Sequence, residues 1–227
     1  MSTTYTWPGW AVTRFEARVM PNLRTFVGPY TPYTQVLDFM GERWSFRVDL
    51  APTVDPIEGA AREAFFDRLK GAANYVSLWH QKLLAPQGTM RDGVTGSVVN
   101  GSLAAVSVVN GSLAAVTVVA GTPAVATPVA QGSNTAQLRT LAGKTVRAGD
   151  MLGIVGQLVR VMADATADGN GLLSIEMQPR ARSTWPAGAA VAWNKPTANF
   201  MLKADGVPTS WVPGYAEGAS IEFIEAL

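Results

Sequence analysis

Hydrophobic and polar residues alternate strictly in two segments near the start of the chain. Residues 42–50 and residues 14–19 both follow a period of two, which is that of a β-strand with one buried face. In the first segment the apolar face carries Trp44, Phe46, Val48 and Leu50, and the polar face carries Arg43, Ser45, Arg47 and Asp49. In the second, Phe15, Ala17 and Val19 lie opposite Arg14, Glu16 and Arg18. Both segments are predicted to be half-buried strands.

A helix is predicted immediately after the first of these strands. Asp55 is a favourable N-cap, Pro56 suits the first helical position, and Glu58 has the spacing of a capping box. Gly71 can end the helix in the left-handed conformation. The expected buried residues, at helical spacing, are Ile57, Ala61, Ala64, Phe65 and Leu69. Residues 74–79 return to a strand pattern, so one helix should lie across a β-sheet or sandwich.

The charged side chains of these elements are expected to form a solvated surface. They are Arg43 and Arg47 on the strand, and Glu58, Arg62, Glu63, Asp67, Arg68 and Lys70 on the helix. Arg62 follows Glu58 by four positions, a spacing that favours an ion pair on a helix. In an oligomer the same charges would instead meet a neighbouring subunit.

The middle of the chain has an unusual composition. From Gly93 to Leu138 there is no Asp, Glu, Lys, Arg or His. A helix across a bilayer needs about 20 mostly apolar residues, whereas Asn-Gly pairs and prolines interrupt this stretch. No membrane span is therefore predicted.

A ten-residue repeat lies inside this uncharged stretch. The sequences VVNGSLAAVS, VVNGSLAAVT and VVAGTPAVAT occupy residues 98–127. Asn-Gly favours a type I′ turn, so the repeat predicts an antiparallel meander with turns at Asn100–Gly101, Asn110–Gly111 and Ala120–Gly121. A disordered low-complexity linker is the alternative.

The rest of the chain reads as β structure. Strands are expected within residues 152–162 on either side of Gly156, and again at 172–177, with a loop at 163–171 between them. Three further strands are expected near the C-terminus, at 199–203, 210–212 and 220–227.

Composition argues against several kinds of chemistry. The 227 residues include no cysteine and one histidine, His80, so disulfides, thiol nucleophiles and paired-histidine metal sites are excluded. A Ser–His triad is disfavoured, since His80 is expected to be an ordinary residue at a strand rim. The 18 basic residues nearly balance the 17 acidic ones, which gives no electrostatic field for sequence-specific nucleic-acid binding. The first ten residues lack the pattern of a secretory signal.

Two groups of residues invite a specific hypothesis. Asp164, Asp168 and Asn170, with Gly169 and Gly171, hint at a calcium loop, but their spacing departs from that of an EF-hand and favours a hairpin turn. The aromatic residues of the Pro/Gly-rich segments, which either pack in the core or stack on sugars, are Trp185, Trp193, Trp211 and Tyr215. No carboxylate pair for glycoside hydrolysis is identifiable. No catalytic, cofactor-binding or metal-binding residue is predicted.

The order of motifs resembles a known family. Phe26–Pro29 (FVGP), Gln35, and Gly41–Trp44 (GERW) precede the helix, and Tyr75–Trp79 (YVSLW) follows it. This arrangement resembles the ring-forming domain of distal tail proteins of long-tailed, non-contractile bacteriophages, and is similar to minor tail protein M of lambda-like phages. The similarity covers about residues 10–92 and 195–227.

The resemblance implies a fold and a function. The fold would be mainly β, with a sandwich- or barrel-like ring domain at 1–92 and 195–227, one packed helix, and an all-β insertion domain at 93–194. The function would be that of a structural virion protein, not an enzyme, made in the host bacterial cytoplasm. A homohexameric ring would join the tail tube protein to the tail-tip hub protein. A trimeric tip hub protein, or a tail-tip module that binds host surface glycan, is the alternative.

Overall fold

The chain forms a mainly β structure of two compact units. The computed structural model describes residues 2–27, 33–91, 98–99, 105–106, 123–204 and 206–226. Unit 1 comprises Met1–Lys82, Gly156–Leu158 and Thr197–Leu227, and unit 2 comprises Leu83–Val155 and Val159–Pro196. Strands account for 45% of the structure, with one helix in the described residues. The predicted fold class is confirmed.

The boundaries of the units differ from the predicted domain limits. Unit 2 begins at Leu83 rather than at 93, and unit 1 resumes at Thr197 rather than at 195. The earlier start has a physical reason, because Met90 is fully buried in the core of unit 2. The backbone N–H of Met90 also donates to Thr145 O at 2.9 Å, within the same unit.

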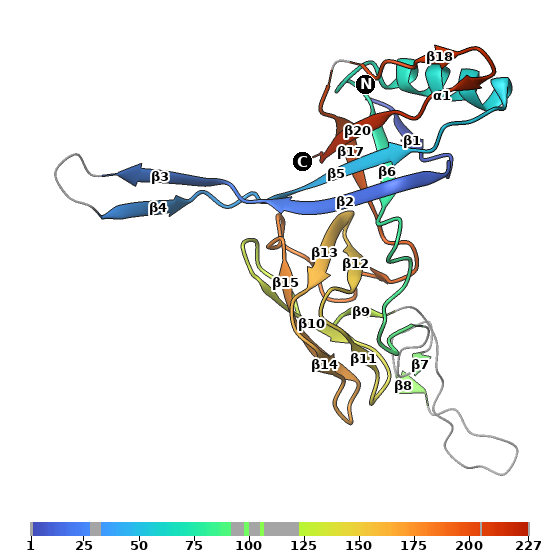
Figure 1. Cartoon of the computed structure of the whole chain (residues 1–227). Helices are drawn as coiled ribbons and strands as arrows, with labels where there is room; N and C mark the ends of the chain where they lie inside the picture. The colour runs from blue at the N-terminus through green and yellow to red at the C-terminus, as the bar shows by residue number, and fades with distance from the viewer. Residues whose placement is uncertain are drawn as a thin grey trace, which may run out of the picture. The chain divides into compact units, whose positions relative to one another are not determined.

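Unit 1 is built on one mixed six-stranded sheet to which both ends of the chain contribute (Figure 1). The order across the sheet is β1-β6-β17-β20-β5-β2. In chain order the strands are β1 (Thr4–Thr6), β2 (Val12–Met20), β5 (Arg43–Leu50), β6 (Tyr75–Trp79), β17 (Thr197–Leu202) and β20 (Ser220–Glu225). β1 pairs with β6 in parallel, and the other pairs are antiparallel.

The apolar face of this sheet has the composition that the alternation predicted. On β5, Trp44, Phe46 and Val48 are fully buried, and Phe46 stacks on Phe200 of β17 with ring centroids 4.4 Å apart. On the opposite face Arg47 is exposed, whereas Ser45, also predicted on the polar face, is buried. β2 follows the same alternation, so both predicted strands are confirmed.

The helix α1 (Pro56–Leu69) begins and ends close to the predicted residues. The Asp55 carboxylate accepts a hydrogen bond from the Ile57 N–H at 2.9 Å, as expected of an N-cap. The C-cap is Lys70, in the left-handed conformation, and not Gly71, which follows it with a positive φ of 64°. Glu58 does not complete a capping box; its carboxylate instead accepts hydrogen bonds from Thr53 and Arg62.

The buried face of α1 agrees only in part with the predicted one, since Phe65 and Leu69 are buried as expected. Ile57 is 77% exposed, and Ala61 and Ala64 are also exposed. The residues that are buried are Gly59, Arg62, Phe65, Phe66 and Leu69. Arg62 can take a core position because its guanidinium donates to Ala51 O at 2.6 Å and to Glu58 Oε1 at 2.7 Å. The predicted Glu58–Arg62 pair is confirmed, but Arg62 is not part of a solvated surface.

Aromatic rings pack the start of the chain against α1. Phe65 makes edge contacts with Trp7 and Trp10, with ring centroids 6.1 and 5.2 Å apart. Trp7 in turn contacts Phe223 of β20 at 5.9 Å. The helix is thereby fixed to the apolar side of the sheet by contacts from both chain ends.

Two hairpins complete unit 1. One pairs β3 (Leu23–Val27) with β4 (Thr34–Asp38), and the other pairs β18 (Trp211–Val212) with β19 (Tyr215–Ala216). Of these four strands, only β18 was predicted, as the strand at 210–212.

Unit 2 contains a nearly closed six-stranded antiparallel barrel. Its order is β16-β12-β13-β15-β10-β9. The strands are β9 (Ala124–Val125), β10 (Thr135–Arg139), β12 (Met151–Ile154), β13 (Gln157–Val161), β15 (Leu172–Gln178) and β16 (Val191–Ala192), and a small ribbon pairs β11 (Thr145–Val146) with β14 (Ala165–Thr166). β14 occupies part of the predicted loop at 163–171. An isolated bridge between Ala124 and Ala190 brings the two ends of the sheet together.

Of the ten-residue repeat, the structure describes residues 98–99, 105–106 and 123–127. β7 (Val98–Val99) pairs with β8 (Ala105–Val106), and Val99 lies opposite Ala105. The predicted turns at Asn100–Gly101, Asn110–Gly111 and Ala120–Gly121 lie outside the described residues.

The orientation of α1 leads to a test. Phe66→Ala should lower the free energy of unfolding by about 3–5 kcal/mol, because it removes a buried aromatic ring. Ile57→Ala should change it by less than about 0.5 kcal/mol, because that side chain is exposed. Chemical denaturation of the monomeric protein measures both values. A larger loss for Ile57→Ala would mean that the buried face is the one predicted from the sequence.

Candidate functional site

The largest group of exposed apolar side chains in the described part of the chain lies on the β3–β4 hairpin. We define the arm as β3 and β4 together with Tyr33, Phe39 and Met40. All ten residues of the two strands are exposed. Figure 1 shows that the arm extends away from the sheet of unit 1. Its large apolar side chains, which are between 47% and 77% exposed, are Leu23, Phe26, Val27, Tyr33, Val36, Leu37, Phe39 and Met40.

Both faces of the arm carry apolar side chains. Residues that pair directly across the hairpin share a face, so Thr25 with Val36 lie on one side and Arg24 with Leu37 on the other. The pair of Phe26 and Gln35 shares the face of Leu37. An isolated two-stranded ribbon is at best marginally stable in water. The arm therefore has the composition of a surface that is completed by contact with another molecule.

The area of the arm is large for a surface of one subunit. Eight side chains of roughly 200 Å² each, about half exposed, present on the order of 800 Å². The largest apolar patch on a typical monomer is about 300–600 Å². A specific protein interface buries about 800 Å² on each partner. Summed over its two faces, the arm thus approaches the area of one side of a protein–protein interface.

The base of the arm is fixed by local hydrogen bonds. Phe39 N donates to Asn22 O at 3.0 Å, and the Asn22 side chain donates to Met40 O at 2.9 Å. The Asp38 carboxylate accepts from the Met40 N–H at 2.9 Å. Met40 and Gly41 have positive φ values of 59° and 77°, which turn the chain into β5. These contacts set the direction in which the arm leaves the sheet.

A second exposed apolar surface lies over the start of α1. We define the helix patch as Val54, Ile57, Trp211 and Tyr215, which are between 40% and 81% exposed. The β18–β19 hairpin is joined to the residues before α1 by paired hydrogen bonds between Thr53 and Ala216, at 3.0 and 2.8 Å. Trp211 rests directly on the helix, since a Cβ added at Gly59 would lie 2.4 Å from its ring. Any residue larger than glycine at position 59 would displace the ring.

A buried polar cluster holds α1 in place beneath this patch. Glu58 accepts hydrogen bonds from Arg62 at 2.7 Å and from Thr53 at 2.9 Å. These two hydrogen bonds lower the pKa of Glu58 below its ordinary value of 4.5, although partial burial opposes the shift. The Arg62 guanidinium also lies over the Trp10 ring, 5.8 Å from its centroid. The ionised carboxylate thus contributes to the position of the helix.

The aromatic residues proposed as sugar platforms have separate environments. Trp185 is fully buried in the core of unit 2, and its backbone pairs with Val129. Trp193 is half-buried against the same core. Packing is therefore confirmed for these two, whereas Trp211 and Tyr215 are exposed and belong to the helix patch.

The acidic residues of the suspected calcium loop make separate hydrogen bonds. The Asp168 carboxylate accepts from the Asn170 and Leu172 N–H groups, both at 2.8 Å, which forms a turn. Asp164 accepts from the Ala148 N–H at 2.8 Å and pairs with Arg147. These hydrogen bonds, first that of Ala148 and then that of Arg147, lower the pKa of Asp164. In the described residues no three acidic or histidine side chains gather as a metal site would require.

The single histidine packs against the sheet of unit 1. Its ring contacts Phe15 edge-on, with centroids 4.7 Å apart, and its Nδ1 accepts from the Lys82 N–H at 3.3 Å. Its place directly after β6 agrees with the predicted rim position.

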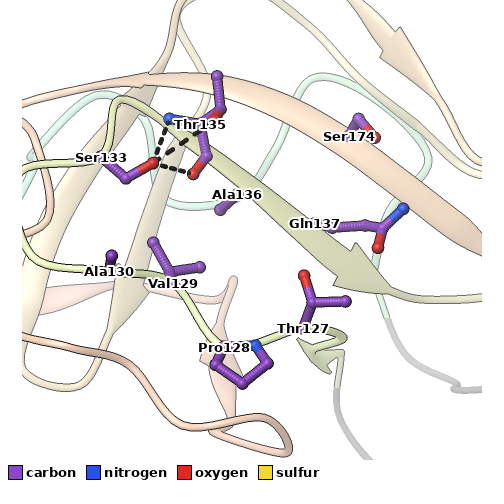
Figure 2. Close-up of a pocket in the computed structure, with 9 residues that line it drawn as sticks. All are labelled: Thr127, Pro128, Val129, Ala130, Ser133, Thr135, Ala136, Gln137 and Ser174. Carbon is purple, nitrogen blue, oxygen red and sulfur yellow. Dashed lines mark hydrogen bonds between the residues drawn. The ribbon is translucent and has the colours of Figure 1, made fainter.

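A polar pocket of about 280 Å³ lies on the barrel of unit 2. Figure 2 shows Ser133 and Thr135, joined by hydrogen bonds, at one end and Thr127 with Gln137 at the other. The remaining lining residues are Pro128, Val129, Ala130, Ala136 and Ser174. Hydroxyl and amide groups thus line the pocket, together with small apolar side chains and without a charged one.

Comparison with known proteins adds no assignment. No protein-family model and no curated protein matches the sequence. No helix among the residues that the structure describes is long and apolar enough to cross a membrane. A functional assignment therefore depends on the arm, the helix patch and the pocket.

The pKa of Glu58 gives a test of the polar cluster. Because the folded state lowers this pKa, the ionised carboxylate stabilises the protein above pH 4.5. That contribution is lost as the pH falls through the lowered pKa. The difference in free energy of unfolding between the wild type and Glu58→Gln should therefore be largest at neutral pH and shrink below 4.5.

Glu63→Gln, at an exposed position of α1, is the matched control for removal of a helical carboxylate. Denaturant titrations at a series of pH values measure the free energy of unfolding of the wild type and of the two variants. The role given to the Glu58 carboxylate would be refuted if the difference in free energy of unfolding between the wild type and Glu58→Gln stayed constant through the acid range.

Proposed function

We propose that this chain is a structural protein of a bacteriophage virion, which assembles into a ring at the distal end of a non-contractile tail. The observation that carries the proposal is the arm, an exposed two-faced apolar hairpin of about the area of a subunit interface. Such a surface suits a protein that acts by assembly rather than by catalysis.

The resemblance to ring-forming tail proteins gives the setting for this assembly. It rests on the GERW and YVSLW segments on either side of α1. In support, GERW leads into β5 and YVSLW forms β6 of one sheet, to which the C-terminal strand β20 also belongs. The proposed partners are other copies of this chain, six in one ring, with the tail tube protein on one side and the tail-tip hub protein on the other. The proposed location is the tail tip of the virion.

Quantitative analysis of purified phage particles tests this proposal. We expect six copies of this chain per tail, located at the end of the tail tube in images of the particles. Three copies would instead indicate a trimeric tip hub protein, and absence from purified particles would refute the virion assignment.

The role of the arm can be tested with the purified protein. The triple variant Phe26→Ser, Val36→Ser and Leu37→Ser should weaken self-association by roughly a hundredfold or more, because three side chains lose apolar contact area. Analytical ultracentrifugation over a range of concentrations measures the change.

The matched control is a second triple variant, at exposed apolar residues of unit 2: Leu84→Ser, Val155→Ser and Met162→Ser. The control should associate like the wild type. Equal weakening in both variants would exclude a specific role for the arm.

The polar pocket favours a second candidate function, the binding of host glycan by unit 2. Its neutral hydroxyl and amide groups match the hydrogen-bonding groups of an uncharged sugar, and its volume of about 280 Å³ is at the small end of ligand sites. Trp185 takes no part in this candidate site, because it is buried in the core.

A glycan array with the wild type and Gln137→Ala tests this second candidate. Binding of neutral glycans that is lost in the variant would support it, because Gln137 lines the pocket. Absence of any binding above background, or binding that Gln137→Ala leaves unchanged, would exclude the pocket as a sugar site.

A further inference from the structure

The exposed large apolar residues of unit 1 fall into two groups. Among the residues that the structure describes, all of them belong either to the arm or to the helix patch. The two groups differ in shape, since one is a projecting ribbon and the other is a surface supported by a helix. We infer that the arm of one copy of this chain docks on the helix patch of the next copy. This inference rests on the proposed self-assembly and names its interface.

The arm cannot reach the helix patch of its own chain. It leads into the start of β5, whereas α1 follows the end of the same strand. The eight residues of β5 span roughly 26 Å. Figure 1 accordingly shows the arm and α1 at opposite ends of β5 within unit 1. Contact between the two surfaces therefore requires two molecules.

The helix patch is ready to receive a partner without rearrangement. Trp211 is in place because its ring rests on Gly59, and Tyr215 lies on the hairpin that pairs with Thr53. Ile57 occupies the first turn of α1 next to the N-cap. A surface that is already ordered loses little conformational entropy when it binds.

The charges near the helix patch and near one face of the arm have opposite signs, while Asp38 lies on the other face of the arm. Asp55, which is exposed, lies between Val54 and Ile57 in the sequence, and Glu217 follows Tyr215 by two positions. The arm face that carries Phe26 and Leu37 has one charged residue, Arg24. Its guanidinium lies over the Phe39 ring, 5.9 Å from the centroid, so it remains near the apolar side chains. The two acidic residues next to the patch residues in the sequence thus suit the basic residue of this arm face.

Contact between two different surfaces is also compatible with the proposed ring. When a surface binds to an unlike surface on an identical molecule, the contact is heterologous and generates a ring if the rotation closes. Each subunit then makes two such contacts. One face of the arm, with about half of its area, is modest for a single interface, and closure of the ring compensates by holding each subunit on both sides.

The absence of cysteine from the sequence allows a direct test by cross-linking. Leu37→Cys places one thiol on the arm, and Ile57→Cys places one on the helix patch. Both side chains are exposed, so neither variant removes a core residue. The two single variants are mixed at a concentration at which the wild type assembles, and are then oxidised.

The expected product of the mixture is a covalent dimer that contains one chain of each variant. A chain with both substitutions should yield a ladder of products up to the size of the closed ring. The control mixture pairs Leu37→Cys with Val155→Cys, an exposed position of unit 2. Arm-to-patch dimers should exceed control dimers by at least about tenfold, because only docked residues are held together.

Other outcomes would overturn the inference and distinguish it from the proposed function. If the wild type assembles but the mixture gives no more dimer than the control, the docking is wrong while the ring proposal stands. A preponderance of dimers formed by Leu37→Cys alone would indicate contact between two arms and would also refute the docking. If the wild type neither assembles nor occurs in phage particles, the inference and the proposed function fail together.

Discussion

The pairing of β20 with β5 is the interaction on which the rest of unit 1 depends. It joins residues 220–224 to residues 45–49, and β20 in turn pairs with β17. The Glu225 carboxylate at the end of β20 accepts a hydrogen bond from the Trp44 N–H at 3.1 Å, in a buried environment. Because β5 carries the arm at its start and leads to α1 at its end, the register of this pairing fixes the positions of both exposed apolar surfaces.

Sequence patterns predicted the parts of the fold that depend on local periodicity. β2 and β5 alternate because one face of each is buried, and α1 is delimited by Asp55 and by the turn after Leu69. The face of α1 was not predictable in the same way. A hydrophobicity pattern counts Arg62 as a surface residue, and only the folded structure supplies the Ala51 carbonyl and the Glu58 carboxylate that allow its burial.

The candidate sites were less predictable because they depend on tertiary contacts. Apolar residues on both faces of the arm give no alternation, so the sequence indicated no strand there. Trp185 and Trp211 both lie in Pro/Gly-rich segments, yet Trp185 is buried in a barrel core and Trp211 is exposed, with its ring resting on Gly59. A glycine inside a helix was the available signal, since it indicates that another group approaches the helix closely.

In the proposed assembly, the arm of unit 1 is stabilised when another copy of the chain covers it. Amide hydrogen exchange tests this claim most directly, because it reports on the backbone of β3 and β4 in the monomer and in the assembly. We predict fast exchange at residues 23–27 and 34–38 in dilute monomer and strong protection of the same amides after assembly. Equally fast exchange in both states would contradict the claim that the arm is covered by a neighbouring copy.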